Sequence, residues 1–301
     1  MSSVLVVGSV ALDSVKTTTE QHDNLLGGSA SYASVAASFW TPVNMVGIVG
    51  EDFPQPFLDL FAKKKIDTMG LQRVPGKTFA WSGEYEQDMN NRRTLSVELN
   101  VFEYFQPILP EAYRQSEFVL LANIAPKLQS HVLDQMSRPK FVIADTMDLW
   151  INIAREDLCE LLKRVDMLIL NDSEAKQLTG CTHLISAGAA LQKMGPKYVA
   201  IKKGEHGCLL FGDKEFFAMP AYPIENLKDP TGAGDCFAGG TIGFLAAGGE
   251  VSFKELKRAI VCGSIVASIN VESFSLKRLE ELDQREINLR YKLMKEFTRF
   301  E

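Results

Sequence analysis

The sequence is short of the residues that cross-link small extracellular proteins or ligate metals. Its 301 residues include five cysteines and four histidines, and neither type shows the close spacing of metal ligands. The cysteines are odd in number and form no C-x-x-C pair, which favours a reduced, cytoplasmic compartment. No apolar run is long enough to span a bilayer, and the N-terminus lacks the basic region of a signal peptide. We therefore expect a cytoplasmic protein with no membrane partner.

Positive charge and two common phosphate-binding motifs are also missing. Lysine and arginine total 32 against 38 acidic residues, a net charge of −6, so nucleic acid is not an expected partner. The first apolar run leads into Gly8-Ser9-Val10-Ala11 instead of G-x-G-x-x-G, and there is no G-x-x-x-x-G-K-S/T. Any phosphate site must therefore be built from local donors of another kind.

The dominant pattern is an alternation of short apolar runs and helical segments. Residues 4–7 form a continuous apolar run ending in glycine, which is typical of a buried strand in a parallel sheet. The alternation predicts an α/β protein with an open, mostly parallel, doubly wound sheet, and we expect 1–301 to be a single domain. The expected strands are 4–7, 43–49, 118–122, 141–144, 167–170 and 198–202, with a hairpin over 208–218, and the expected helices are 29–39, 54–65, 129–136, 155–163, 173–178, 185–194, 236–247, 253–271 and 276–297.

Two segments depart from this pattern of strands and helices. Residues 78–85 and 92–101 alternate apolar and polar side chains around Asp88-Met89-Asn90-Asn91, which predicts a hairpin with one solvated face. Together with a strand near the start of the chain it would make a small sheet outside the main core. We therefore expect a lid formed by about 12–20 and 78–101. Lid strands can pair between subunits or remain alone, so monomer and homodimer both stay open.

The most informative segment is the glycine-rich run from Asp229 to Gly240, which reads D-P-T-G-A-G-D-C-F-A-G-G. Free N–H groups at a helix start, together with the positive end of the helix dipole, form an anion site. Asp235 puts a carboxylate beside that site, where it can take the proton of an attacking hydroxyl. The run predicts phosphoryl transfer, and a plain capped helix start is the alternative. The expected donors are the N–H groups of Gly232, Ala233, Gly234 and Asp235.

Other candidate residues precede or begin expected helices. Asp13 follows the first strand, where ligands of open α/β sheets bind, and would bind substrate hydroxyls or serve as a turn residue. Gly27 and Gly28 would admit a ligand to the backbone or allow tight helix packing. Cys236 lies in the first turn of its helix, as a reactive thiol of lowered pKa or as a buried inert one.

Two further loops follow expected strands. The first carries an Asn/Glu pair that would hold Mg²⁺ through water or cap the next helix. The second carries a lysine and two glycines, which would let the loop lie flat against a nucleotide or form an ordinary hairpin turn. These residues are Asn171 and Glu174 in the first loop, and Lys202, Gly204 and Gly207 in the second.

Taken in order, these segments resemble the phosphofructokinase B/ribokinase family of small-molecule kinases. Residues 229–240 are similar to its C-terminal signature, Gly27-Gly28 to its N-terminal Gly-Gly, and Asn171-x-x-Glu174 to its N-x-x-E. The resemblance implies a ribokinase-like fold with a small β-sheet lid, and ATP with Mg²⁺ as cofactors. The implied sites are Asp13, Gly27, Gly28 and Arg92 for the acceptor; Asn171, Glu174, Lys202, Gly204, Gly207, Thr231 and Asn270 for the nucleotide, with Glu174 also holding Mg²⁺; and Asp229 and Thr231 near a K⁺ ion.

The sequence departs from the family pattern at two places. The Asn usually found shortly after Gly-Gly is replaced by the run 29–32, and residues 268–275 lack the Gly-Ala pair of ribokinases. The resemblance implies transfer of the γ-phosphoryl group of ATP to the hydroxymethyl group of a small neutral sugar, with Asp235 as general base. The alternatives are a nucleoside (adenosine-like) kinase and a catalytically silent nucleotide- or sugar-sensing protein on the same fold.

Overall fold

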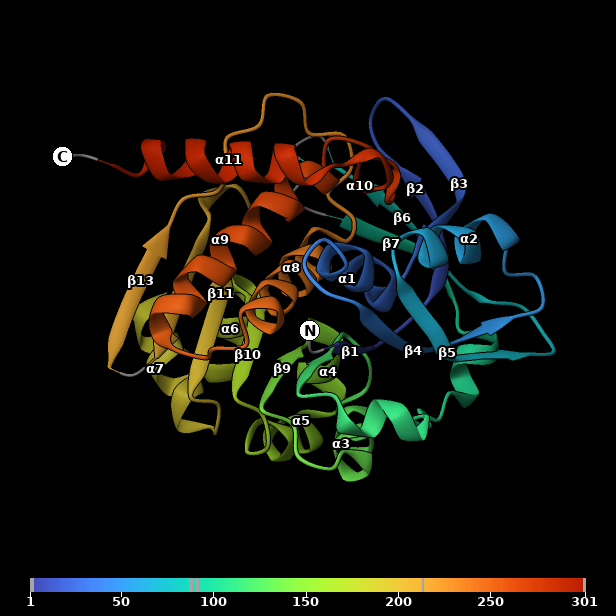
Figure 1. Ribbon diagram of the computed structural model, residues 1–301, viewed down its shortest axis with the longest axis horizontal. Helices are drawn as coiled ribbons and strands as arrows, with labels where there is room; N and C mark the ends of the chain where they lie inside the picture. Colours follow the sequence, from blue (N-terminus) through green and yellow to red (C-terminus); the bar gives the residue numbers. More distant parts are fainter. Residues whose placement is uncertain (1–2, 87–88, 90–91, 213, 300–301) are drawn as a thin grey trace.

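The main layer of the protein is a nine-stranded sheet, seen in a computed structural model that describes residues 3–86, 89, 92–212 and 214–299 (Figure 1). Its strands are β1 (Val4–Val7), β4 (Val43–Gly50), β5 (Ile66–Val74), β8 (Phe118–Leu121), β9 (Phe141–Asp145), β10 (Met167–Asn171), β11 (Tyr198–Lys202), β12 (Cys208–Gly212) and β13 (Glu215–Met219). They are arranged as β13-β12-β11-β10-β9-β8-β1-β4-β5. Neighbours from β11 to β5 are parallel, and β12 and β13 are antiparallel, so the mostly parallel sheet is confirmed.

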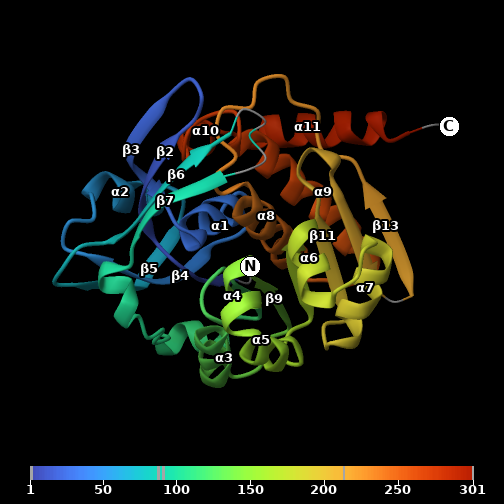
Figure 2. The same cartoon turned by 180° about the vertical axis from the view of Figure 1, so that it is seen from behind.

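Helices cover both faces of this sheet. In β1, Val4 and Val6 belong to one buried cluster and Leu5 and Val7 to the other, because successive strand residues point to opposite faces. One face, in front in Figure 1, carries α1 (Ser29–Ala37), α2 (Gln55–Lys63), α8 (Ala233–Gly248), α9 (Phe253–Asn270), α10 (Lys277–Glu281) and α11 (Gln284–Phe297). The other face, in front in Figure 2, carries α3 (Pro126–Gln135), α4 (Asp148–Ile153), α5 (Arg155–Leu162), α6 (Asp172–Thr179) and α7 (Leu184–Lys193).

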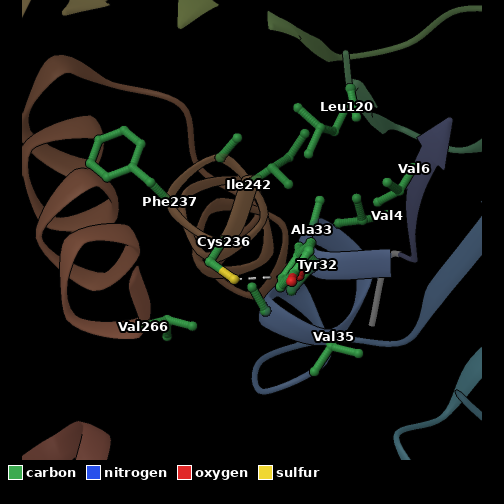
Figure 3. Close-up of a cluster of buried hydrophobic side chains, with 14 of the residues drawn as sticks. Val4, Val6, Tyr32, Ala33, Val35, Leu120, Cys236, Phe237, Ile242 and Val266 are labelled. Carbon is green, nitrogen blue, oxygen red and sulfur yellow. Dashed lines mark hydrogen bonds between the residues drawn. The ribbon is translucent and has the colours of Figure 1, made fainter. Parts of the chain in front are cut away.

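Helices α1 and α8 pack against each other through small residues. A Cβ atom added to Gly239 of α8 would collide with the backbone of Ala33 in α1. Figure 3 shows Cys236, near the start of α8, beside Tyr32 of α1, in the same buried cluster as Val4 and Val6. This close packing fixes the first turn of α8 against the main sheet.

A second sheet of four strands lies outside the main core. Its strands are β2 (Ala11–Lys16), β3 (Gln21–Gly27), β6 (Phe79–Tyr85) and β7 (Arg92–Glu98), in the order β3-β2-β6-β7. Strand β2 pairs antiparallel with β3 and parallel with β6, and β6 pairs antiparallel with β7. The small sheet is thus confirmed, although the sequence analysis missed β3. The first half of β3, Gln21–Asn24, is polar and does not alternate, so it carries no strand pattern.

Other expected boundaries differ from the structure. The expected helix over 276–297 is two helices, because Asp283 caps α11 by accepting hydrogen bonds from the N–H groups of Arg285 and Glu286. The sequence analysis also missed β5 and α4. The expected hairpin turn over 88–91 lies mostly outside the described residues, which include only Met89. Among the described helices, none combines the length and apolar character needed to cross a membrane.

Candidate active site

Two of the predicted site residues lie at the carboxyl edge of the main sheet. Asp145, Asn171 and Lys202 are the last residues of β9, β10 and β11, which lie side by side. Because parallel strands end at the same edge, their polar terminal side chains meet there. The sequence analysis identified Asn171 and Lys202 by this rule. It missed Asp145, because the expected strand stopped at Ala144.

The glycine-rich run forms the turn into α8. Gly232 is the residue before the helix and has a φ angle of 76°, and no side chain caps the helix start. A Cβ atom at Gly232 would collide with the ring of Tyr32, so only glycine fits. Asp235 lies in the first turn, where the N–H groups have no partner within the helix.

The structure differs from expectation at Ala233. Its N–H group already donates to the carbonyl of Pro230 at 3.2 Å. Of the four N–H groups expected to hold an anion, that of Ala233 is therefore already used within the turn.

The amine of Lys202, in a largely buried ion pair, brings a positive charge to the same place. The Lys202 amine lies 3.4 Å from both carboxylate oxygens of Asp145, and the two side chains are 18% and 5% exposed. The amine is also 2.9 Å from the position that a Cβ atom on Gly234 would occupy. Burial alone would lower the pKa of Lys202, but the carboxylates of Asp145, Glu174 and Asp235 hold it above its usual value. A protonated lysine therefore faces the start of α8.

Asn171 and Glu174 form a reciprocal cap on α6. The Asn171 side chain accepts the Glu174 N–H at 2.8 Å, and Glu174 Oε2 accepts the Asn171 N–H at 2.7 Å. Burial raises the pKa of Glu174 to about 7. The capping alternative is therefore realised. It leaves the second carboxylate oxygen of Glu174 outside the cap, which fits an ion held through its water shell. Among the described residues, no group of three or more acidic, His or Cys side chains could hold a metal directly.

On the lid, Asp13 and Gly27 lie against each other. Asp13 in β2 is 5% exposed, and a Cβ atom at Gly27 would overlap its carboxylate. Gly28 packs tightly against the backbone of Ser9, as the packing alternative predicted. The glycine pair thus makes room for the Asp13 carboxylate and lets α1 begin close to the first strand.

A hydrogen-bond network fixes the loop before α8. The Tyr85 hydroxyl, from lid strand β6, lies 3.0 Å from Thr231 Oγ1. The Asn270 amide donates to the Thr231 carbonyl at 2.9 Å, and the Thr231 N–H donates to Asp229 at 2.9 Å. Potassium binds to oxygen atoms that face it. At least one oxygen each of Asp229 and Thr231 accepts from an N–H group here, so the expected K⁺ site near these residues stays a prediction.

Three predicted residues follow β11 or lie at the start of β7. Gly204 begins an exposed 3₁₀ turn, and Gly207 follows it and closes it back onto Lys203. The turn continues directly from the end of β11, and its expected contact with a nucleotide stays a prediction. The backbone of Arg92 starts β7, but its side chain lies outside the described residues.

The reactive-thiol hypothesis for Cys236 is wrong. The side chain is 0% exposed, and its Sγ atom points at the carbonyl oxygen of Tyr32, 3.8 Å away (Figure 3). Burial first, and then the nearby Asp235 carboxylate, raise the pKa of the thiol well above its usual value. The first turn of a helix lowers a thiol pKa only when the side chain reaches solvent or a cation.

We therefore expect alkylation of the native protein to spare Cys236. The half-buried Cys159 and Cys181 should react first, because a thiolate must form and reach the reagent. Peptide mass spectrometry after brief treatment with iodoacetamide measures each site. Modification of Cys236 at the rate of Cys159 in folded protein would contradict this assignment.

A separate hollow of about 970 Å³ lies beyond the loop that leads to α8. Its walls come from the β2–β3 turn, the loop 222–228 and the C-terminal helices. The two arginines that line it, Arg278 and Arg290, are already bonded to Glu272 and Glu286. The hollow therefore shares none of the charged residues of the site at the start of α8.

Comparisons with known proteins match most of the chain. A family model described as pfkB family carbohydrate kinase matches residues 1–281. The cytidine kinase of Thermococcus kodakarensis is 33% identical over 82% of this chain and 88% of its own length. The aminoimidazole riboside kinase of Salmonella typhimurium is 25% identical over 89% of this chain and 90% of its own length.

Solved structures share the fold at lower identity. Aminoimidazole riboside kinase from Salmonella enterica, complexed with aminoimidazole riboside and an ATP analogue, gives a TM-score of 0.79 at 18% identity, covering 96% of this chain and 99% of that one. The ribokinase from Thermotoga maritima gives 0.77 at 20% identity, covering 97% of this chain and 100% of that one. At these identities the likeness establishes the ribokinase-like fold.

Proposed function

The chain belongs to the pfkB family of carbohydrate kinases, and we propose that it transfers the γ-phosphoryl group of ATP to the hydroxymethyl group of a neutral, ribose-like acceptor. One observation carries the proposal: a carboxylate, an uncapped helix start and a buried cation meet at one point. These are Asp235, the first turn of α8 and Lys202. The three supply a base, amide donors and positive charge, the components that phosphoryl transfer requires.

In the proposed reaction, Asp235 accepts the proton of the acceptor hydroxyl. The hydroxyl oxygen forms a bond to the γ-phosphorus, and the bond between that phosphorus and the ADP oxygen breaks. The N–H groups of Gly234 and Asp235 and the Lys202 amine stabilise the negative charge on the moving phosphoryl group. Magnesium, which would screen the charge of the ATP phosphates, would be held through water by Glu174 beside Asn171. Gly204, Gly207, Thr231 and Asn270 would border the nucleotide.

Asp13 is the proposed contact for acceptor hydroxyls. Its carboxylate and that of Asp235 would repel an anionic acceptor, so a neutral one is favoured. Two observations favour a nucleoside over the free monosaccharide expected from the sequence. Trp81 pairs with Asp13 across β6 and β2, so the two lie on one face of the lid, where an indole could stack on a base. The relative that is 33% identical over most of the chain is a cytidine kinase.

A screen for acceptor-dependent ADP release tests the function. Purified protein with Mg·ATP is offered neutral monosaccharides, ribonucleosides and their phosphorylated forms, one at a time. We expect release with a ribonucleoside, and none with a phosphorylated sugar. Nucleotide binding without ADP release for any acceptor would instead favour the silent sensing protein.

Asp13→Ala is expected to raise the acceptor KM and leave the ATP KM nearly unchanged. The carboxylate lies on the lid, whereas the proposed phosphate site lies at the start of α8. Losing a charged hydrogen-bond acceptor should cost about 1.5–3 kcal/mol of acceptor binding, roughly 10- to 150-fold in KM. Asp23→Ala, in neighbouring strand β3, is a control from the same sheet. Equal losses for both substrates would contradict the assignment.

A further inference from the structure

The pairing of Asp145 with Lys202 links strands that are not neighbours. Asp145 ends β9 and Lys202 ends β11, while β10 lies between them and ends at Asn171. The lysine side chain therefore leans across the end of β10 to reach the carboxylate, 3.4 Å away. The same orientation of the side chain places the Lys202 amine 2.9 Å from the position that a Cβ atom on Gly234 would occupy.

Burying the Asp145–Lys202 pair has a large desolvation cost in free energy. Desolvation of two charged groups offsets most of their mutual attraction, so stability alone is a weak reason for the pair. Burial raises the pKa of Asp145, which shows that the carboxyl is held in an unfavourable place for its charge. A lysine also has a long flexible stem that reaches several partners. Among the described residues, the carboxylates of Glu174 and Asp235 would still attract Lys202 without Asp145.

We propose that Asp145 is a positioning residue, which holds the Lys202 amine beside Gly234 so that its charge meets the transferring phosphoryl group. The inference rests on the proposed function and adds a residue to it. Asp145 acts through Lys202 and touches neither substrate. If Asp145 acts in this way, the effect of removing Asp145 must depend on the presence of Lys202.

Asp145→Asn keeps the shape of the side chain and removes its charge. We expect kcat to fall about 10²-fold, the loss that a misplacement of about 1 Å can cause, with the acceptor KM unchanged. Asp166→Asn is the control, because Asp166 is another carboxyl whose pKa is raised by burial, although it is only half-buried. It accepts the Val142 N–H at the opposite, amino end of the sheet, and its substitution should leave the kinetics unchanged.

The deciding comparison is a double-mutant cycle in kcat with Lys202→Met. If Asp145 acts through Lys202, the double variant should be as slow as Lys202→Met alone. A further loss of 10-fold or more in the double variant would overturn the proposal, as would an unchanged kcat in Asp145→Asn. If Asp145→Asn does not fold, Lys202→Met and the double variant still decide the question. The double variant removes both charges of the pair, so it buries no unpaired charge.

Wild-type turnover is measured first and separates the two claims. No acceptor-dependent ADP release by wild type would overturn the proposed function, and this inference with it. Wild-type release combined with independent losses at Asp145 and Lys202 would overturn this inference alone.

Discussion

Asp235→Asn is expected to lower kcat about 10²–10⁴-fold, the usual contribution of a positioned base. The amide keeps the size of the side chain but cannot accept the proton of the acceptor hydroxyl. The ATP KM should change little, because the N–H groups of the turn and Lys202 remain in place. Steady-state kinetics with a saturating acceptor measure both quantities.

The control for this variant is Asp157→Asn. Asp157 occupies the third residue of α5, as Asp235 does in α8, but it lies on the opposite face of the sheet. Both substitutions remove a carboxylate from a first helical turn, so they share any effect on the helix dipole. A folded Asp235→Asn variant with wild-type kcat would remove Asp235 from the mechanism.

Gly234→Val is expected to lower kcat about 10²–10³-fold without unfolding the protein, the loss that follows removal of a preorganised donor. A Cβ atom there meets only the end of the flexible Lys202 side chain, so the fold can adjust. The added side chain would displace the lysine amine and block the approach of phosphate to the backbone. Gly248→Val, where a Cβ atom would meet nothing within 4 Å at the other end of α8, is the matched control.

Gly232→Val should behave differently and serves as a second comparison. Its backbone has a positive φ angle, and a side chain would collide with the buried Tyr32 ring. We expect this variant to lose thermal stability as well as activity. A Gly234→Val variant that melts as early as Gly232→Val would assign both glycines to packing alone.

Much of this arrangement could be predicted from the sequence, because it follows from strand ends. A parallel sheet places its carboxyl ends along one edge, so Asn171 and Lys202 had to lie near each other. The proposed role of the Gly232–Asp235 turn also follows from its residue types, because glycines at a helix start predict an anion site and the aspartate predicts a base. The small sheet was predicted from the alternation of apolar and polar residues in β6 and β7. In the structure the described β7 side chains are all exposed, including Leu95 and Val97, so the alternation located the strand without showing which residues are buried.

The rest depends on contacts that spacing does not encode. Asp145 forms an ion pair with Lys202, which lies two strands away in the sheet, and only the strand order places the two side chains together. Cys236 was open to two interpretations because the sequence does not reveal which way α8 turns against α1. Its burial against Tyr32 decides between them. In the hydrogen-bond network around Thr231, Asn270 is 39 residues away in the sequence and Tyr85 is 146 residues away. No local sequence pattern could therefore predict this network.

The fate of the γ-phosphorus tests the central claim most directly. Wild-type protein, Mg·ATP and the best acceptor from the screen are followed by phosphorus NMR. We predict that the γ-phosphate signal of ATP is replaced by a phosphomonoester signal split by the two protons of the acceptor methylene, in step with ADP. Appearance of inorganic phosphate alone, or of a phosphate on a ring hydroxyl, would contradict transfer to a hydroxymethyl group at the start of α8.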